Sequence, residues 1–144
     1  MHSGKCLDVP GGSTANDVLI DQWDCVTTAS WELFRFERIG GSPYYQIRTA
    51  AEKCVDLQAW SLLDDTPVLQ YTCHAAGVTK PNQQFRLELV SGGGYEPVVR
   101  LQVVHSGKCL RVSGASTANG ARIVQAPCAA NPAPEARFAL RLEP

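Results

Sequence analysis

The sequence predicts an all-β protein assembled from three similar units, and three observations lead to this prediction. Six cysteines form three pairs, and the two members of each pair lie 19 residues apart. Each pair encloses the same alternation of apolar residues. No segment shows a 3.6-residue apolar period with helix caps, so we expect very little helix. The pairs are Cys6 and Cys25, Cys54 and Cys73, and Cys109 and Cys128.

The first two strands of each unit lie on either side of a turn. The residues one and three positions after the first cysteine are apolar, and an apolar residue 14 positions after it is followed two positions later by glutamine. Such period-two alternation is typical of strands with one buried face. Turn-forming residues that tolerate positive φ lie between the strands. These positions are Leu7, Val9, Asn16-Asp17, Ile20 and Gln22; Val55, Leu57, Asp64-Asp65, Val68 and Gln70; and Leu110, Val112, Asn119-Gly120, Ile123 and Gln125.

A third strand follows the second cysteine of each pair, because apolar residues again alternate there. A Gly-rich turn then leads into a fourth strand, at residues 45–48 and 98–103, which opens the next unit. The alternating residues of the third strand are Phe34 and Phe36, Phe85 and Leu87, and Phe138 and Leu140.

Three four-stranded units leave few possible architectures. A β-propeller needs at least about four blades, and a sandwich would not generate a threefold repeat. Three units around one axis can instead pool their apolar faces in a closed barrel, which removes most strand edges. We therefore predict a β-trefoil with pseudo-threefold symmetry, forming a single domain over residues 1–144 with repeats at about 1–44, 45–97 and 98–144.

The first repeat differs from the others at its start. Only five residues precede Cys6, so its first strand is missing from the sequence. An unpaired barrel edge is unfavourable, and we expect that the chain was cut from a longer secreted protein or that its start was misassigned.

Charge and cysteine content narrow the function classes. Thirteen basic and 14 acidic residues give a net charge of −1, which argues against nucleic acid or an anionic membrane as the main partner. No apolar run approaches the length of a membrane span. Three equivalent units most simply form three equivalent disulfides, and this indicates a secreted, extracellular protein, although no signal peptide is present in this chain. The alternative is a zinc site or free buried thiols, but no C-x-x-C, the usual spacing of zinc ligands, occurs. We expect no metal and no cofactor.

The repeated cysteine pattern resembles that of the ricin-B-type lectins. Each copy reads K-C-L-D-V or a close variant, followed by a glutamine three residues before the second cysteine, and the copies cover essentially the whole chain. In that family such β-trefoils also occur as carbohydrate-binding modules attached to secreted bacterial glycosidases. The tryptophan of the family's Q-x-W motif is replaced by Phe34, Phe85 and Phe138, and its glutamine is present only as Gln83. Phenylalanine can fill the same core position, so the expected fold is unchanged.

The resemblance implies a sugar site in which three kinds of residue act together. These are an aspartate two residues after the cysteine, an aromatic residue 15 positions later, and polar residues just before Q-x-W. The chemistry is suitable, because a flat aromatic face covers the C–H side of a pyranose while polar groups bind its hydroxyls. A carboxylate accepts two hydroxyl hydrogens in charge-assisted bonds.

The second repeat keeps every residue of this set. The roles implied are Asp56 accepting from two hydroxyls, Tyr71 stacking on the ring, His74 and Asn82 binding at its rim, and Gln83 orienting Asp56. The alternative is that Asp56 tightens a turn and that Tyr71 is half-buried packing. Trp60 could form a second wall of the same pocket or be surface packing.

The first repeat keeps part of the set. Asp8 and Trp23 have the 15-residue spacing, but Ser30 or Trp31 replaces the asparagine and Glu32 the glutamine. We expect a stacking platform with weaker polar contacts, or a Trp23 that lies at a rim without a ligand.

The third repeat has lost the set. Arg111 replaces the aspartate, Ala126 the aromatic residue and Glu135-Ala136 the Asn-Gln pair. An arginine cannot accept a hydrogen bond, so this repeat is expected to serve the fold. His2 and His105 in the repeated H-S-G-K-C are interpreted as turn residues.

The function expected from these residues is non-catalytic carbohydrate binding. The resemblance implies galactose, lactose or xylan-type glycans as ligands and a catalytic domain in the parent chain as a partner. One alternative is a glycosidase with paired carboxylates, although no second acid recurs near Asp56. Another is a trefoil protease inhibitor or protein-binding module, for which residues 75–81 are the best loop.

Overall fold

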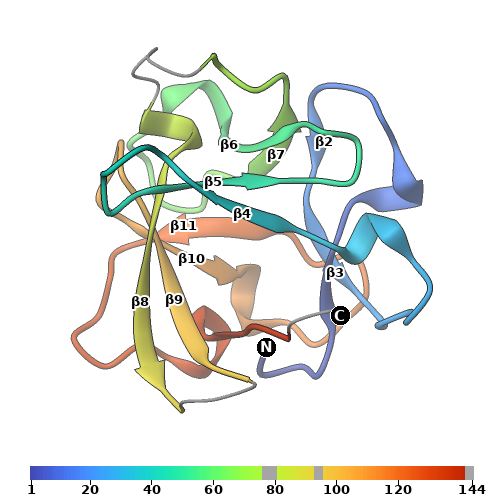
Figure 1. The fold of residues 1–144 in the computed structure, drawn as a ribbon. Helices are drawn as coiled ribbons and strands as arrows, with labels where there is room; N and C mark the ends of the chain where they lie inside the picture. Colours follow the sequence, from blue (N-terminus) through green and yellow to red (C-terminus); the bar gives the residue numbers. More distant parts are fainter. Residues whose placement is uncertain (76–80, 93–95, 142–144) are drawn as a thin grey trace.

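The computed structural model describes residues 1–75, 81–92 and 96–141, and within these ranges it contains only strands and short 3-10 helices (Figure 1). None of these helices is long or apolar enough to cross a membrane. The strands are β1 (Cys6–Asp8), β2 (Val18–Leu19), β3 (Asp21–Trp23), β4 (Arg35–Arg38), β5 (Tyr45–Arg48), β6 (Cys54–Leu57), β7 (Val68–Tyr71), β8 (Phe85–Ser91), β9 (Val98–Val103), β10 (Cys109–Val112), β11 (Ile123–Ala126) and β12 (Phe138–Ala139). The 3-10 helices are η1 (Pro10–Gly12), η2 (Ser30–Glu32), η3 (Gln58–Trp60), η4 (Pro81–Gln83), η5 (Ser113–Ala115) and η6 (Pro134–Ala136).

The strand pairing is that of a β-trefoil, as predicted. Barrel strands pair in the antiparallel order β4–β5–β8–β9–β12. Three hairpins complete the repeats, namely β1 with β3, β6 with β7, and β10 with β11. Neighbouring hairpins also join one another, because β2 pairs with β7 and bridges link Asp21 to Arg122 and Pro67 to Val124.

The barrel has one seam without strand pairing. Residues 1–5 form no strand, and within the described residues no strand joins β4 to β12. Met1 and Leu140, from the two sides of this seam, both pack against the central apolar cluster.

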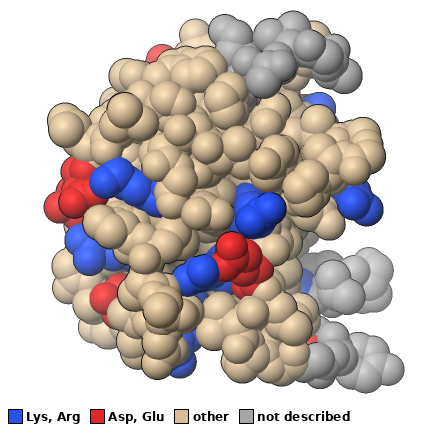
Figure 2. Space-filling model, turned by 90° about the vertical axis from the view of Figure 1, so that its left-hand side faces the viewer, with Lys and Arg blue, Asp and Glu red and all other residues tan. Residues whose placement is uncertain are grey.

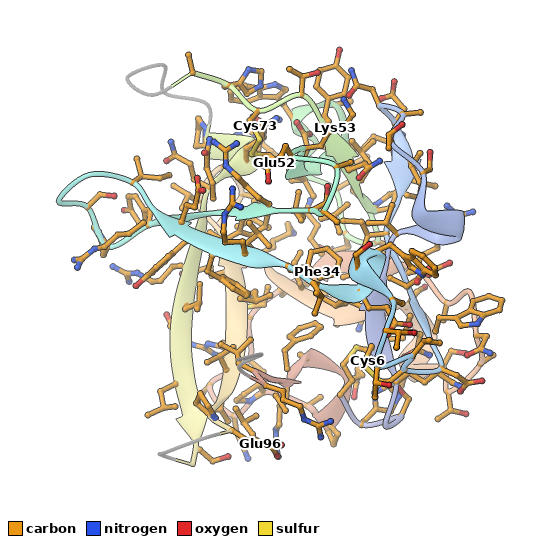
Figure 3. All side chains as sticks on the ribbon, turned by 45° about the vertical axis from the view of Figure 1, so that its right-hand side comes forward. Cys6, Phe34, Glu52, Lys53, Cys73 and Glu96 are labelled. Carbon is orange, nitrogen blue, oxygen red and sulfur yellow. A yellow bond between two sulfur atoms is a disulfide. The ribbon has the colours of Figure 1, made fainter. Side chains whose placement is uncertain are left out.

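A single apolar cluster fills the centre and takes residues from all three repeats. Its members come from the alternating positions of the sequence pattern. Phe85 and Phe138 are buried in it, and Phe34 packs against it (Figure 3). Phenylalanine therefore occupies the core at the position where the resemblance led us to expect tryptophan.

The three disulfides form as the repeat predicted. They join Cys6 to Cys25, Cys54 to Cys73 and Cys109 to Cys128, with Cα–Cα distances of 5.1, 4.9 and 5.0 Å, and no cysteine is free. In the chain-entropy account, closing each loop of about 20 residues stabilises the fold by up to about 3 kcal/mol.

Three buried glutamines fix each repeat to the one that precedes it around the axis, so that the first repeat is joined to the third. Gln22, Gln70 and Gln125 are 0% exposed. Each side-chain amide donates to two backbone carbonyls in the loop of the preceding repeat, and each amide oxygen accepts from a hydroxyl of its own repeat. The carbonyls are those of Ser116 and Ala118, Ser13 and Ala15, and Ser61 and Leu63; the hydroxyls are those of Ser3, Thr49 and Ser106.

Replacing one of these glutamines should destabilise the whole fold. In Gln125→Leu the Ser61 carbonyl loses its amide donor, the Ser106 hydroxyl loses its acceptor, and the Leu63 carbonyl keeps only the Thr66 hydroxyl. Each polar group left without a partner costs about 1–3 kcal/mol. We expect the free energy of unfolding to fall by about 3 kcal/mol in urea titration. Gln102→Leu is the matched control, since its amide donates to the Gly107 carbonyl at an exposed position and should cost less than about 1 kcal/mol. Equal losses in both variants would contradict this role.

Candidate functional site

The β6–β7 hairpin brings Asp56 and Tyr71 to one face. The register pairs Asp56 with Leu69 and Cys54 with Tyr71, and paired residues two positions apart share a face of the sheet. Leu69 and Cys54 are buried, whereas Tyr71 is 36% exposed. A carboxylate therefore lies on the same face as a phenol ring that reaches the surface.

Helix η4 supplies two amides to Asp56. Asn82 Nδ2 donates to Oδ1 at 3.0 Å and Gln83 Nε2 donates to Oδ2 at 2.8 Å. Gln83 is itself fixed, because its Nε2 also donates to the Thr72 carbonyl and its Oε1 accepts from the backbone N–H of His74 at 3.0 Å. The structure thus joins Asp56, Asn82 and Gln83 directly. Tyr71 lies on the same face as Asp56, and the His74 backbone holds Gln83.

One polar atom of this cluster lacks a partner. Asn82 Oδ1 is buried and accepts no hydrogen bond from the described residues. Each oxygen of Asp56 accepts one amide N–H, and a carboxylate has about four lone-pair sites. Acceptor capacity therefore remains on both residues.

Burial and hydrogen bonding act in opposite directions on the pKa of Asp56. Removal from water raises the pKa of this carboxyl, while the hydrogen bonds from Gln83 and Asn82 and the nearby His74 act in the opposite direction. The amides favour the ionised form because they donate to it.

His74 and Trp60 each make a contact that was not expected of them. His74 contributes its backbone N–H to the site by holding Gln83. Trp60 contacts the third repeat, because its ring packs edge-on against the ring of His105 with centroids 5.2 Å apart. This contact accounts for the position of Trp60 by packing.

The first repeat places a second carboxyl beside Asp8, which the sequence interpretation missed. The β1–β3 register pairs Asp8 with Asp21 and Cys6 with Trp23, so the two acids and the indole share a face. Asp21 is 7% exposed and stands where the second repeat has Leu69. The signal was in the sequence, since Asp21 precedes Trp23 by two positions.

The Asp8–Asp21 pair binds a proton more readily than a free aspartate does, because the pKa values of both carboxyls are raised. Burial, the charge of Asp8 and a hydrogen bond to Asp8 raise the pKa of Asp21 to about 6, and Arg122 opposes this. Burial and the charge of Glu32 raise the pKa of Asp8. Below about pH 6 Asp21 holds a proton that it can donate to Asp8. Two carboxyls in hydrogen-bond contact are too close for a glycosidase pair, whose separation is roughly 5 Å or more.

Helix η2 gives Asp8 no amide donor. Glu32 takes the place of Gln83, and its Oε2 accepts from the Val26 backbone N–H at 2.7 Å, as Gln83 Oε1 does from His74. The other oxygen, Oε1, is buried without a partner among the described residues. A carboxylate cannot donate, so the first repeat presents Asp8 and Trp23 without the contacts that hold Asp56.

In the third repeat Arg111 occupies the aspartate position. Its Nη2 donates to Asp65 Oδ1 at 2.9 Å, and Ala126 leaves no aromatic platform. The cluster of the second repeat has no counterpart here.

Within the described ranges, no group of His, Cys, Asp and Glu side chains is arranged to hold a metal. Charges of both signs are interspersed on the face shown in Figure 2, most of which is neutral. Of the loop considered for protease inhibition, residues 76–80 lie outside the described residues.

Comparison with known proteins agrees with the β-trefoil fold. The sequence model of the ricin-type beta-trefoil lectin domain matches residues 1–133. The designed threefold-symmetric protein ThreeFoil is similar in structure, with a TM-score of 0.81, 29% identity, and coverage of 98% of this chain and 94% of that one. No curated protein sequence gives a match.

Two natural proteins of known structure are also similar. The exo-beta-1,3-galactanase 1,3Gal43A of Clostridium thermocellum has a TM-score of 0.79 and 25% identity, over 98% of this chain and 28% of the enzyme. The C-half of an earthworm R-type lectin, solved in complex with GalNAc, has a TM-score of 0.65 and 17% identity, over 96% of this chain and 91% of that one.

Stability should depend on pH through Asp21. An acid whose pKa is higher in the folded than in the unfolded state stabilises the fold below about pH 4, and this contribution is lost as the pH rises through about 6. Between pH 4 and pH 7 the free energy of unfolding of the wild type should fall by a contribution of the order of 2 kcal/mol from Asp21. Asp21→Leu should lack this fall and so be more stable than wild type at pH 7. Urea titrations at both pH values measure this. Parallel pH profiles for the two proteins would contradict it.

Proposed function

Because the chain belongs to the ricin-type beta-trefoil lectin family, we propose that it binds carbohydrate without catalysis, through the second-repeat cluster of Asp56, Tyr71, His74, Asn82 and Gln83. The ligands proposed are galactose, lactose or xylan-type glycans. Carbohydrate binding in general follows from the family, and the assignment to this cluster is our proposal.

The observation that supports this assignment most is the way in which Asp56 is held. Two amides orient its carboxylate, and the buried Asn82 Oδ1 beside it has no partner among the described residues. Buried polar atoms are normally hydrogen-bonded, so a ligand that donates to both residues would complete the cluster. Sugar hydroxyls are such donors, and the exposed ring of Tyr71 supplies the apolar face that a pyranose needs.

The same features predict weak binding. Each hydrogen bond contributes about 1 kcal/mol net, and association costs most of the sum. A dissociation constant near the millimolar scale, about −4 kcal/mol, is expected for one shallow site. Weak binding becomes useful through a second site or through tethering to another domain.

Tethering to a secreted glycosidase is the setting that we propose. The galactanase of Clostridium thermocellum is a longer chain of which this protein matches 28%. Three disulfides are consistent with an extracellular location. In such a protein the module would keep the catalytic domain near its polysaccharide.

Substitution of Tyr71 and Asp56 tests the site. Tyr71→Ala removes an exposed platform and Asp56→Ala removes the acceptor, so each should weaken binding of lactose or xylobiose at least about tenfold, measured by NMR titration. Arg111→Ala, at the matching position of the third repeat, should bind normally. Unfolding midpoints check that each variant is folded. Normal binding by folded Tyr71→Ala and Asp56→Ala would refute the assignment.

Acid should weaken binding at this site. The hydroxyls require the ionised carboxylate of Asp56, and burial raises the pKa of that group. Affinity should therefore begin to fall at a pH above the ordinary aspartate range, while the fold is intact by circular dichroism. Affinity that stays constant until the protein unfolds would speak against a role for the Asp56 carboxylate.

A further inference from the structure

The three junctions between repeats are built in the same way, except for one. At two of them a histidine four residues before the first cysteine of a repeat reaches the last residue of the preceding 3-10 helix. His2 Nε2 donates to the Ala115 carbonyl at 3.0 Å, and His105 Nε2 donates to the Trp60 carbonyl at 2.5 Å. At the junction of the first and second repeats the corresponding residue is Ala50, opposite Gly12.

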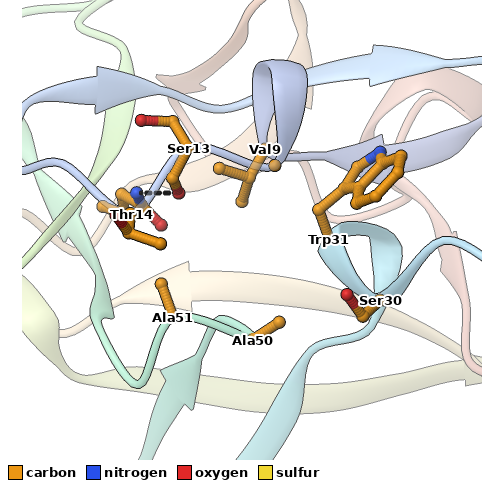
Figure 4. A pocket seen from close by; sticks show the side chains of 9 residues that line it. Val9, Ser13, Thr14, Ser30, Trp31, Ala50 and Ala51 are labelled. Atoms are coloured by element: carbon orange, nitrogen blue, oxygen red, sulfur yellow. Dashed lines mark hydrogen bonds between the residues drawn. The ribbon is translucent and has the colours of Figure 1, made fainter.

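A crevice lies at the junction where this imidazole is absent. A space of about 140 Å³ lies beside Ala50, with Ala51 and Val9 as further apolar lining and Trp31 at one side (Figure 4). Within the described residues, no side chain donates to the Gly12 carbonyl in the place of the absent histidine.

Trp31 forms an aromatic wall of this crevice. Its indole lies against the backbone of Gly12, since a Cβ atom there would be 3.0 Å from Trp31 Cε3. Gly12 also has a φ of +62°, which side chains rarely adopt. The indole is thus held against the main chain while 39% of the residue is exposed.

The residues that line the crevice indicate which kind of ligand it can bind. Hydroxyl-bearing residues, namely Ser13, Thr14 and Ser30, line the crevice together with the indole, and none of its lining residues is charged. A cavity of about 150 Å³ holds a benzene ring, so one six-membered ring fits here. Because the crevice is open to solvent, substituents of that ring can project outward.

We propose that the crevice at the junction of the first and second repeats is a separate binding subsite for one neutral pyranose ring. The C–H face of the sugar lies on Trp31, and one hydroxyl donates to the Gly12 carbonyl, as the histidine side chains do at the other junctions. This inference rests on the proposed carbohydrate-binding function. The crevice contains no residue of the Asp56 cluster and neither Asp8 nor Trp23, although Ser30 and Trp31 stand at the asparagine position of the first repeat.

The test is an NMR titration of labelled protein with lactose and with xylobiose, in which the indole N–H signal of Trp31 and the ring signals of Tyr71 are followed separately. The Trp31 signal is assigned from its loss in Trp31→Phe. In the wild type we expect the Trp31 signal to move with at least one sugar, and to move equally in Asp56→Ala. An unmoved Trp31 signal at saturation of the Tyr71 site would overturn the proposal.

Ala50→His is the matched filling variant, because histidine stands at this position in both other junctions. It should fold with an unchanged or higher melting temperature, abolish the Trp31 response and leave the Tyr71 response unchanged. Trp31→Ala, which removes the wall, provides an independent variant and should reduce total bound sugar by one site. An undiminished Trp31 response in Ala50→His, or unchanged stoichiometry in Trp31→Ala, would contradict the subsite.

The two proposals fail in different ways. A response at Tyr71 alone refutes the crevice and leaves the proposed function intact, whereas a response at Trp31 alone refutes the second-repeat site and supports the crevice. Silence at both positions refutes both. Imidazole is the probe for another occupant, and a Trp31 response to imidazole but to neither sugar would overturn the saccharide assignment.

Discussion

The buried glutamine amides are the interaction on which the rest of this structure depends. Each joins two carbonyls of the preceding repeat to its own hairpin, at a position with no exposure to water. A buried carbonyl without a donor is costly, so each loop has one favourable position. These loops follow directly after η1, η3 and η5, and the glutamines therefore also fix the edges of the three hairpin faces.

On this common framework, the neighbours of one strand position decide the chemistry of each repeat. Asp56 is held by two amides, which favour its charge. Asp8 occupies the same position, but Asp21 and Glu32 surround it with further carboxyls, so the pKa values of Asp8 and Asp21 are raised and the protonated form is favoured. With Arg111 the third repeat reverses the charge altogether. Local electrostatics, rather than backbone differences, separate the three faces.

The near-symmetry also makes departures from it informative. Two histidines close the junctions between repeats by the same hydrogen bond to a backbone carbonyl. Where alanine replaces histidine, an uncharged crevice with an indole wall is open. In a symmetric scaffold the loss of one side chain can thus leave a candidate site. The two equivalent junctions show which group, a histidine, stands at the corresponding position.

The sequence by itself determined the repeat, the three disulfides, the β-trefoil and the grouping of Asp56 with Gln83. The first three follow from the spacing of residues within the repeat, since the alternation in a strand fixes which side chains share a face. The grouping of Asp56 with Gln83 was implied by the resemblance to the ricin-B-type lectins. The same alternation places Asp21 on the face of Trp23, but only the strand register showed that Asp21 lies opposite Asp8. Contacts between repeats were decided by the tertiary structure alone. His2 and His105 lie in turns, as interpreted, yet they also bridge repeats, and the packing of Trp60 on His105 and of Ala50 opposite Gly12 joins residues far apart in the chain. Such contacts depend on how whole hairpins pack around the axis, which no local pattern encodes.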